Sequence, residues 1–389
     1  MFPDLQLWLK VLLAVAAAGV IAFCTTPIVV SFAKKVGAMD VPDFKRHIHT
    51  HPTPRMGGMA IFLGFLISVL LFAEISRPVQ GILIGAVIIV ATGVVDDIIQ
   101  MKYYFKLCAQ LLAAVIAVLH GVTIQGLMNP NVFSETETVF IGALSIPVTI
   151  IWIVGITNAV NLIDGLDGLA CGVSAISSVT MLVAALLVAE PNVAVILAAL
   201  TGGCVGFIPY NLNPAKIFMG DTGALLLGYV LATVSILGLF KFYAVMTFLV
   251  PVLALALPLF DTLFAIIRRL IRGQNPMTPD RGHLHHRLID HGLSQKQAVA
   301  VLYSLSAMMG LTAVVLCSTG SLRLLLLVLD VVFAAAVGIF VYRTIEHPAH
   351  NVKTDPPPGA DAYRDMLDRL EQAASKQAAE SHLEAKKKK

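Results

Sequence analysis

Two adjacent aspartates end a long apolar stretch in the run Val94-Val95-Asp96-Asp97-Ile98. Neighbouring carboxylates repel each other unless a cation or a proton lies between them. Mg²⁺ is usually held by one or two carboxylates together with the phosphates of a substrate. The pair therefore favours a site for magnesium and phosphate, and Lys106, farther along, could contact a phosphate there. Two solvated charges at the end of a helix are the plainer alternative.

Amides and carboxylates recur at intervals of three residues in a second motif, residues 158–168. This spacing places Asn158, Asn161 and Asp164 on one face of a helix, and Asp167 follows at the same interval. The two glycines of the motif allow close approach to the backbone. A simple turn would not need four polar side chains at regular intervals beside apolar segments, so the motif favours a binding site.

A third motif, Phe218-Met219-Gly220-Asp221-Thr222-Gly223, places one carboxylate at the start of an apolar stretch. The Asp221 carboxylate could bind a metal ion. It could equally be an ordinary cap that accepts hydrogen bonds from the first amides of a helix. Taken alone, this motif supports both interpretations.

A fourth motif gathers three histidines, His283, His285 and His286, in a segment rich in arginine that includes Arg281. Neighbouring imidazoles could ligate zinc, but the arginines would repel a dication. Arginine binds phosphate oxygens through two parallel hydrogen bonds. The segment is therefore interpreted as a clamp for a diphosphate, with zinc as the minor alternative.

The composition is that of a membrane protein. Of 389 residues, 57% are hydrophobic and 13% are charged, whereas soluble domains carry roughly 25% charged residues. This excludes a soluble multidomain enzyme and a disordered chain. The net charge of +3 leaves no basic footprint for nucleic acid. The five cysteines lie far apart without a C-x-x-C pair, so neither a disulfide framework nor a cysteine zinc site is indicated.

The apolar segments predict an all-α polytopic integral membrane protein. A helix that crosses the bilayer needs about 20 mostly apolar residues, and about eleven stretches of the chain qualify or come close. They cover residues 11–32, 56–73, 79–95, 107–120, 143–160, 169–189, 193–208, 222–240, 242–267, 298–317 and 322–342. Pro258 should bend the ninth of these helices, beside Asp261, and we expect the bent helix to flank an apolar groove for a lipid chain.

The distribution of lysine and arginine predicts the orientation. With the N-terminus outside, 23 of the 27 lysines and arginines fall in inward-facing segments or in the C-terminal tail. Inward-facing segments of membrane proteins carry this excess of positive charge. We therefore expect a cytoplasmic C-terminus, a membrane domain over residues 1–345 and a cytoplasmic extension over residues 346–389. The uncharged outer segment 121–144 could form a short hairpin.

All the polar motifs fall on the cytoplasmic side in this topology. A one-sided arrangement at the membrane surface is typical of an enzyme that acts on one soluble and one lipid substrate. A transporter for an anionic solute is the alternative from another class, but transporters more often bury ionisable groups near the midplane and are built from repeated halves. Asp330, in the middle of the last predicted span, is the exception, and we assign it only a buried polar contact.

Five ordered motifs resemble those of the bacterial polyprenyl-phosphate N-acetylglucosamine-1-phosphate transferases of glycosyltransferase family 4. They are PTPRMGG at 52–58, DD at 96–97, NAVNLIDGLDG at 158–168, FMGDTG at 218–223 and PDRGHLHHRL at 279–288. The related phospho-N-acetylmuramoyl-pentapeptide transferases usually have three consecutive histidines. Leu284 interrupts that run here, which favours the N-acetylhexosamine branch.

The resemblance implies a magnesium-dependent phosphoglycosyltransferase at the inner face of the bacterial cell membrane. The substrates would be a UDP-N-acetylhexosamine, most simply UDP-GlcNAc, and undecaprenyl phosphate. The products would be UMP and undecaprenyl-diphospho-GlcNAc, which would start a teichoic acid or another cell-envelope glycan. Mn²⁺ could replace Mg²⁺, and a homodimer is compatible with the resemblance. The muramoyl-pentapeptide transferase is the closest alternative activity.

The resemblance also implies roles for individual residues. The catalytic group would comprise Asp96, Asp97 and Lys106, and the metal ligands would be Asp221 and Asn161. Lys45 and Arg55 would bind the lipid phosphate. The residues that bind the nucleotide sugar would be Asn158, Asp164, Asp167, Arg281, His283, His285 and His286.

The ionisation of phosphate bears on the part that Asp96 plays. An aspartate is often described as the base in this family. A phosphomonoester, however, has a second pKa near 6 and is mostly dianionic at neutral pH. We therefore expect Asp96 to position the attacking phosphate or its metal environment rather than to remove a proton.

Overall fold

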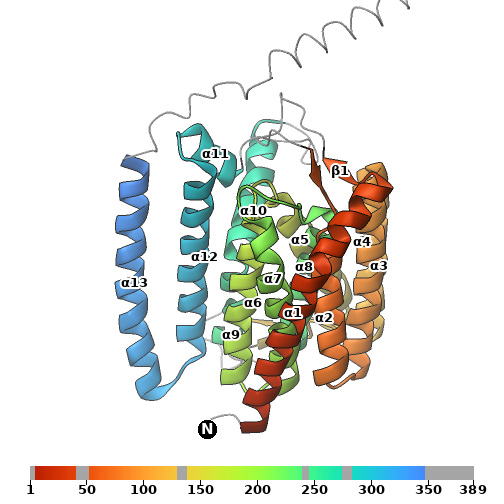
Figure 1. Ribbon diagram of the computed structural model, residues 1–389. Coiled ribbons are helices and arrows are strands. Elements are labelled where there is room, and N and C mark those ends of the chain that lie inside the picture. Colours follow the sequence, from red (N-terminus) through yellow and green to blue (C-terminus); the bar gives the residue numbers. More distant parts are fainter. Residues whose placement is uncertain (1–4, 41–51, 129–137, 239–244, 274–282, 347–389) are drawn as a thin grey trace, which may run out of the picture. The chain divides into compact units, whose positions relative to one another are not determined.

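The computed structural model describes residues 5–40, 52–128, 138–238, 245–273 and 283–346. These residues all belong to one unit, in which helices run alongside one another (Figure 1). Lys45, Arg281 and residues 347–389 of the predicted extension lie outside the described residues.

Thirteen α-helices are described. They are α1 (Leu5–Val36), α2 (Gly58–Phe72), α3 (Arg77–Ile99), α4 (Tyr103–Leu119), α5 (Ser145–Leu162), α6 (Leu169–Leu187), α7 (Pro191–Asn211), α8 (Gly220–Gly238), α9 (Val245–Ala254), α10 (Ala256–Ile271), α11 (Leu284–Asp290), α12 (Gln295–Cys317) and α13 (Gly320–Glu346). Strands β1 (Met39–Asp40) and β2 (Thr53–Pro54) pair antiparallel, as do β3 (Gly126–Met128) and β4 (Thr138–Phe140). The hairpin predicted within residues 121–144 is therefore confirmed, and its location on the outer face remains a prediction.

Eight of the described helices are long and apolar enough to cross a membrane: α1, α3, α5 with its preceding turn, α6, α7, α8, α12 and α13. The apolar helices α2 and α4 are shorter and coincide with the second and fourth predicted spans. An all-α polytopic membrane protein is thereby confirmed. The total of eleven spans and their orientation remain predictions.

Burial separates the helices into central and peripheral ones. In α8, 89% of the most apolar window is buried, against 6% in α13. Helix α8 contacts α2, α3, α5, α6 and α7, so the residues at its start lie where several helices converge.

Glycines allow α1 and α7 to pack closely. A Cβ at Gly202 would collide with α1 at Val15, and a Cβ at Gly206 would collide with it at Gly19. Small residues at this four-residue spacing are a common means of close helix packing in membranes.

The ninth predicted span, where we expected a bend, is interrupted. Helix α9 ends at Ala254 and α10 begins at Ala256, so the break lies at Leu255, just before Pro258. Proline has no N–H to donate to the carbonyl four residues earlier, which here belongs to Ala254. The Ser177 hydroxyl of α6 donates to that carbonyl instead, at 2.5 Å. The interruption therefore leaves no unpaired acceptor at Ala254.

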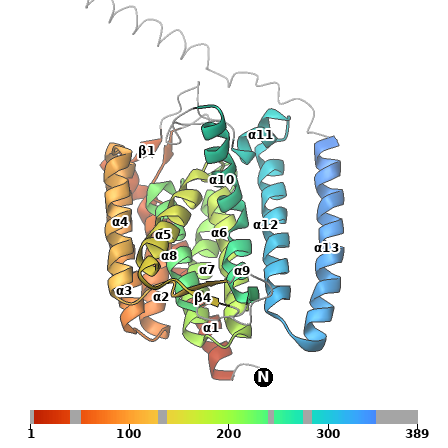
Figure 2. The same cartoon turned by 180° about the vertical axis from the view of Figure 1, so that it is seen from behind.

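The ends of the elements that carry the polar motifs meet at one end of the unit. Strand β1, helix α11 and the last turns of α10 lie there, whereas β4 lies toward the opposite end (Figure 2). Asp330 of α13 accepts a hydrogen bond from the Thr312 hydroxyl of α12 at 3.0 Å. Asp330 thus makes the polar contact that we expected, although its side chain is half-buried rather than buried.

Candidate active site

Lys106 lies between two of the predicted acidic residues. Its Nζ donates to Asp221 Oδ2 at 2.7 Å and to Asp96 Oδ2 at 3.3 Å. These three side chains come from the start of α4, the start of α8 and the end of α3. Asp96 Oδ1 also accepts from the Met101 amide at 2.8 Å. The structure thus brings together three residues that are far apart in the sequence and sets one ammonium group between two carboxylates.

Asp97 caps the N-terminus of α8 from a neighbouring helix. Its Oδ1 accepts from the Asp221 amide at 3.0 Å, and its Oδ2 accepts from the Thr222 hydroxyl at 2.6 Å and from the Thr222 amide at 3.2 Å. The first amides of a helix lack partners within the helix, and a carboxylate there is also favoured by the helix dipole. Asp97 is buried. Its contacts therefore fix the position of the Asp221 backbone.

Backbone hydrogen bonds join the PTPRMGG segment, residues 52–58, to the third motif, residues 218–223. The Gly57 and Gly58 amides donate to the Phe218 and Met219 carbonyls at 3.0 and 2.9 Å, and the Phe218 amide donates to the Pro54 carbonyl at 2.8 Å. A Cβ at Gly58 would collide with the backbone at Gly223. Only glycine allows this approach, which explains the paired glycines of the motif.

Arg55 is held beside the site by an acidic partner. Its Nη2 lies 2.7 Å from Asp40 Oδ1, across the β1–β2 pair. The Arg55 charge also acts on Asp164, whose pKa it lowers against larger opposing effects. Arg55 therefore lies within electrostatic range of the second motif as well as of the β1–β2 pair.

The second motif runs from the end of α5 into the following loop. Asn158 Nδ2 donates to Gln110 Oε1 of α4 at 2.6 Å. The side chains of Asn161 and Asp164 are half-buried, and neither makes a hydrogen bond to another described residue. Burial, followed by the nearby Asp221 and Asp97, raises the pKa of Asp164 to about 8. At neutral pH Asp164 is therefore mostly protonated, and a cation bound nearby would favour its charged form.

Asp167 holds a neighbouring loop. Its Oδ2 accepts from Asn213 Nδ2 at 2.9 Å and from the Ala215 amide at 3.0 Å. The same Asn213 amide group donates to Gln295 Oε1 at 2.7 Å, which joins this loop to α12. These contacts give Asp167 an evident structural role, in addition to the binding role that we predicted.

The three histidines lie in residues 283–286, called here the histidine segment, and an aspartate of α10 holds the start of this segment. Asp261 Oδ2 lies 2.9 Å from His283 Nδ1, and Asp261 Oδ1 accepts from the Leu284 amide at 2.8 Å. His283 and the Leu284 amide thus hold both carboxylate oxygens of Asp261. The pair could not be recognised from the sequence, because 22 residues separate its members.

One of the three histidines, His285, contacts the second motif at Gly165. The rings of His283 and His285 are stacked, with centroids 5.8 Å apart and planes 10° apart, and the rings of His285 and His286 are 4.3 Å apart. The His285 ring packs so closely against Gly165 that a Cβ there would collide with it. Burial and the neighbouring His286 lower the pKa of His285 to about 4, so this imidazole is neutral at physiological pH.

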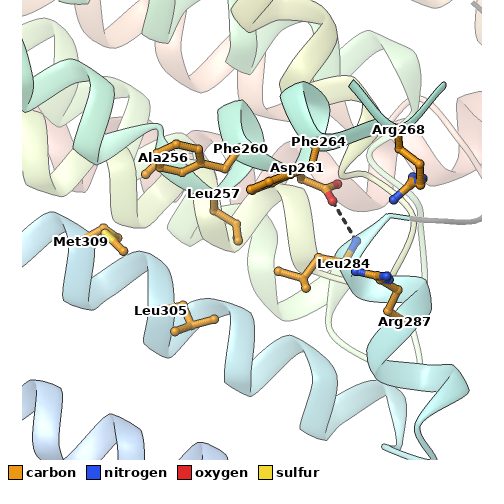
Figure 3. A pocket seen from close by; sticks show the side chains of 10 residues that line it. All are labelled: Ala256, Leu257, Phe260, Asp261, Phe264, Arg268, Leu284, Arg287, Leu305 and Met309. Carbon is orange, nitrogen blue, oxygen red and sulfur yellow. Dashed lines mark hydrogen bonds between the residues drawn. The ribbon is translucent and has the colours of Figure 1, made fainter. Parts of the chain in front are cut away.

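An apolar cavity of about 340 Å³ adjoins Asp261. Its walls come from α10 and α12 and its rim from α11 (Figure 3). Phe260, Phe264 and Met309 contribute apolar surface, whereas Arg268 and Arg287 lie at the charged end. The groove that we expected beside the interrupted helix is therefore present.

The described part of the site suits an open rather than a closed metal site. No three His, Cys, Asp or Glu side chains in this part converge closely enough to hold an ion alone. Magnesium, however, commonly takes one or two protein carboxylates and completes its shell with water and substrate phosphates. Asp221, the half-buried Asp164 and the Asn161 amide are hard oxygen donors of the required type. The donor set therefore fits Mg²⁺ once a phosphate is present.

Several residues of the site have roles that the sequence did not indicate. Gln110, Thr222, Asn213 and Tyr303 all support predicted residues, and the Tyr303 hydroxyl donates to the Gly168 carbonyl at 2.5 Å. Gln110 follows Lys106 by one helical turn, so a polar face on α4 was a usable signal. The other three contacts depend on tertiary packing.

Comparison with known proteins identifies similar chains. Residues 79–239 match the model of glycosyl transferase family 4. The chain is 40% identical to a probable undecaprenyl-phosphate N-acetylglucosaminyl 1-phosphate transferase of Bacillus subtilis, over 75% of this chain and 80% of that protein. It is 31% identical to an undecaprenyl-phosphate alpha-N-acetylglucosaminyl 1-phosphate transferase of Thermotoga maritima, over 75% and 86%. A phospho-N-acetylmuramoyl-pentapeptide-transferase of Thermoanaerobacter is 34% identical over 59% of this chain and 75% of its own length.

Proposed function

The chain belongs to glycosyl transferase family 4, and from that membership we propose its reaction. It transfers N-acetylglucosamine-1-phosphate from UDP-GlcNAc to undecaprenyl phosphate, giving undecaprenyl-diphospho-GlcNAc and UMP. The observation that carries this assignment is the 40% identity to the Bacillus subtilis protein over most of both chains. The muramoyl-pentapeptide relative matches a smaller share of the chain, and Leu284 separates the histidines that are consecutive in that branch.

The nucleotide sugar should bind between the second motif and the histidine segment. Asn161 and Asp164 have polar atoms available there, and His285 closes that side by packing on Gly165. A neutral imidazole can donate one hydrogen bond and accept another, so His285 can recognise the uracil or the sugar without adding charge. Arg281, outside the described residues, remains our candidate for contact with the diphosphate.

The reaction is a displacement at phosphorus. An oxygen of the lipid phosphate attacks the phosphorus that carries the sugar, and the bond from this phosphorus to the bridging oxygen breaks. UMP leaves with that oxygen. Such reactions depend on positioning and charge neutralisation more than on covalent help from the protein. Lys106, already between Asp96 and Asp221, is well placed to approach a phosphate oxygen.

Magnesium is the proposed cofactor, with Asp221 and Asn161 as ligands and Asp164 nearby. The ion would neutralise charge on the diphosphate. Asp97 holds the Asp221 backbone, so it supports the site by positioning. The concentration of carboxylates around Asp164 supports this proposal because a bound cation would relieve their repulsion.

Asp96 is better suited to positioning than to proton removal. Both its oxygens are engaged, one by the Met101 amide and the other by Lys106. The lipid phosphate needs no base because it is mostly dianionic at neutral pH. Asp96→Asn should therefore stay impaired when the pH is raised. Full recovery of the variant's UMP release at pH 9 would refute this role.

The lipid substrate would enter from the bilayer. We propose that the cavity beside α10 holds the part of the isoprenoid chain nearest the phosphate, with Arg268 and Arg287 at the charged end. Lys45 and Arg55 remain candidates for the lipid phosphate, although Asp40 already engages Arg55. The site would face the cytoplasm of a bacterial cell membrane, and the product would begin a cell-envelope glycan such as a teichoic acid.

Release of UMP by the detergent-purified protein tests the reaction. Undecaprenyl phosphate should be supplied with either UDP-GlcNAc or UDP-MurNAc-pentapeptide, with and without Mg²⁺. We expect release with UDP-GlcNAc that requires both lipid and Mg²⁺. Release only with the pentapeptide donor would assign the chain to the sister activity. If neither donor gives UMP release and proteoliposomes take up an anion, a transporter would be favoured.

A further inference from the structure

Asp261 takes part in two features at once. Its side chain lines the cavity between α10 and α12, while its carboxylate accepts hydrogen bonds at the start of α11 (Figure 3). The Asp261 and His283 side chains are only 7% and 6% exposed, so this contact is shielded from bulk water. One carboxylate therefore forms part of the cavity wall and also holds the histidine segment.

A chain of contacts continues from Asp261 to the second motif. His283 donates through Nδ1 to the Asp261 carboxylate, and its ring stacks on that of His285. His285 packs on Gly165, the residue after Asp164. These contacts link the cavity wall to His285, so a change at the wall can alter the position of His285 without any movement of the main transmembrane helices.

We infer that Asp261 is a positioning residue that couples occupation of the cavity by an isoprenoid chain to binding of the nucleotide sugar. This inference rests on the proposed function, which supplies both ligands. The cavity walls match a hydrocarbon chain, and the arginines at one end match its phosphate. A volume of about 340 Å³ is small for the whole lipid, so only the isoprene units nearest the phosphate would lie inside.

The expected coupling is positive. A hydrocarbon in the cavity removes the water that can still reach the 7% exposed Asp261 side chain, and hydrogen bonds strengthen where the local dielectric is low. The histidine segment then moves less, and the nucleotide sugar loses less conformational entropy when it binds. Because such coupling is reciprocal, the nucleotide sugar should also tighten binding of the isoprenoid.

Calorimetric titration of the full-length protein in detergent tests this coupling. UDP-GlcNAc is titrated with and without farnesol, a three-isoprene alcohol that lacks phosphate and cannot react. Farnesol should lower the Kd of the wild type about fivefold or more. Asp261→Asn should bind UDP-GlcNAc with a Kd that farnesol does not change, because the amide cannot accept at both positions.

Asp330→Asn is the matched control. Asp330 also accepts a hydrogen bond between two helices, from Thr312, but it does not line the cavity. This variant should keep the full response to farnesol. A farnesol response that survives in Asp261→Asn, or that disappears in Asp330→Asn as well, would overturn the assigned role of Asp261.

A second variant keeps the test decisive if Asp261→Asn does not fold. Met309→Phe enlarges a side chain on the opposite wall of the cavity and should imitate the ligand. Its Kd for UDP-GlcNAc should be lower without farnesol and respond little to it. If the wild type binds UDP-GlcNAc with no farnesol effect, the coupling fails and the proposed function stands. If the wild type does not bind UDP-GlcNAc, the proposed function fails too.

Discussion

Lys106 is the residue on which the geometry of the acidic site converges. Its ammonium group lies 3.3 Å from an Asp96 oxygen and 2.7 Å from an Asp221 oxygen, although 115 residues separate Lys106 from Asp221. The sequence indicated each acidic residue and suggested a phosphate contact for Lys106. It could not indicate that the lysine lies between the two carboxylates, because that depends on how α4 and α8 pack around α3.

Replacing Lys106 with glutamine should reduce kcat for UMP release about 100-fold, as expected when a preorganised donor to developing charge is lost. The thermal midpoint should change little, because the side chain is half-buried. Lys102→Gln is the matched control, since Lys102 is exposed just before α4. It should keep near wild-type activity. Equal losses in the two variants would show a general effect of positive charge instead.

The neutral state of His285 predicts how stability changes with pH. Its pKa is lowered to about 4 from an ordinary value near 6.5. Below pH 6.5 the unfolded chain therefore binds a proton that the folded chain does not, and the free energy of unfolding falls as the pH drops toward 4. This loss is absent above pH 6.5.

His285→Gln removes that titration. Between pH 7 and pH 5, Tm of the variant should fall less than Tm of the wild type, by roughly 2 °C. Scanning fluorimetry measures both, and each protein's Tm at pH 8 serves as its own reference. Parallel pH profiles for the two proteins would mean that His285 titrates normally in the folded state.

At the scale of elements, the start of α8 determines where the site forms. Asp97 caps this helix, and the segment before α2 is hydrogen-bonded to the loop that leads into it. From the sequence, Asp221 could be either a cap or a ligand. The structure gives the capping contacts to Asp97 on another helix, which frees the Asp221 carboxylate to face Lys106. An inter-helix cap has no signature in local sequence.

Gly58→Ala tests this dependence. A methyl group at Gly58 meets the backbone at Gly223, so α2 and α8 must separate, at a cost of about 1–3 kcal/mol. Tm and UMP release should both fall. Gly155→Ala in α5 is the control, because a Cβ there meets nothing within 4 Å, and it should retain both. An unchanged rate in Gly58→Ala would show that Asp221 tolerates displacement of α8.

For the ninth predicted span, the sequence predicted that the helix is not straight but not where it is interrupted. Pro258 predicted a bent helix beside an apolar groove; the groove is present, and the helix is interrupted rather than only bent. The break lies at Leu255 because the helix can restart once Ser177 has satisfied the Ala254 carbonyl. That hydroxyl comes from α6, 77 residues away in the chain, so the position of the break could not be derived from local residues.

At the scale of the whole molecule, charge asymmetry led to the prediction that all polar motifs meet on one side. The structure gathers residues from α3, α4, α5, α8 and the β1–β2 pair into one site, in agreement with that prediction. Alternating topology constrains which helix ends can meet, which is why a simple count of lysines and arginines was informative. Which side faces the cytoplasm is a separate prediction.

Cysteine accessibility tests the orientation in intact cells. Arg77 begins α3 and Lys102 lies three residues beyond its end, and both are exposed. In a background without the native cysteines, a membrane-impermeant thiol reagent should label Arg77→Cys in intact bacteria. It should label Lys102→Cys only after the membrane is opened. The reverse pattern would invert the predicted topology.

The most direct test of the central claim follows the phosphorus atom. UDP-GlcNAc labelled at the phosphate that carries the sugar is incubated with undecaprenyl phosphate, Mg²⁺ and either the wild type or Asp221→Ala. For the wild type, we predict that the label moves into the lipid together with the sugar while unlabelled UMP is released, and that Asp221→Ala loses this transfer. Sugar in the lipid with the label left in aqueous UDP would contradict transfer of a sugar phosphate, and undiminished transfer by Asp221→Ala would contradict the assigned site.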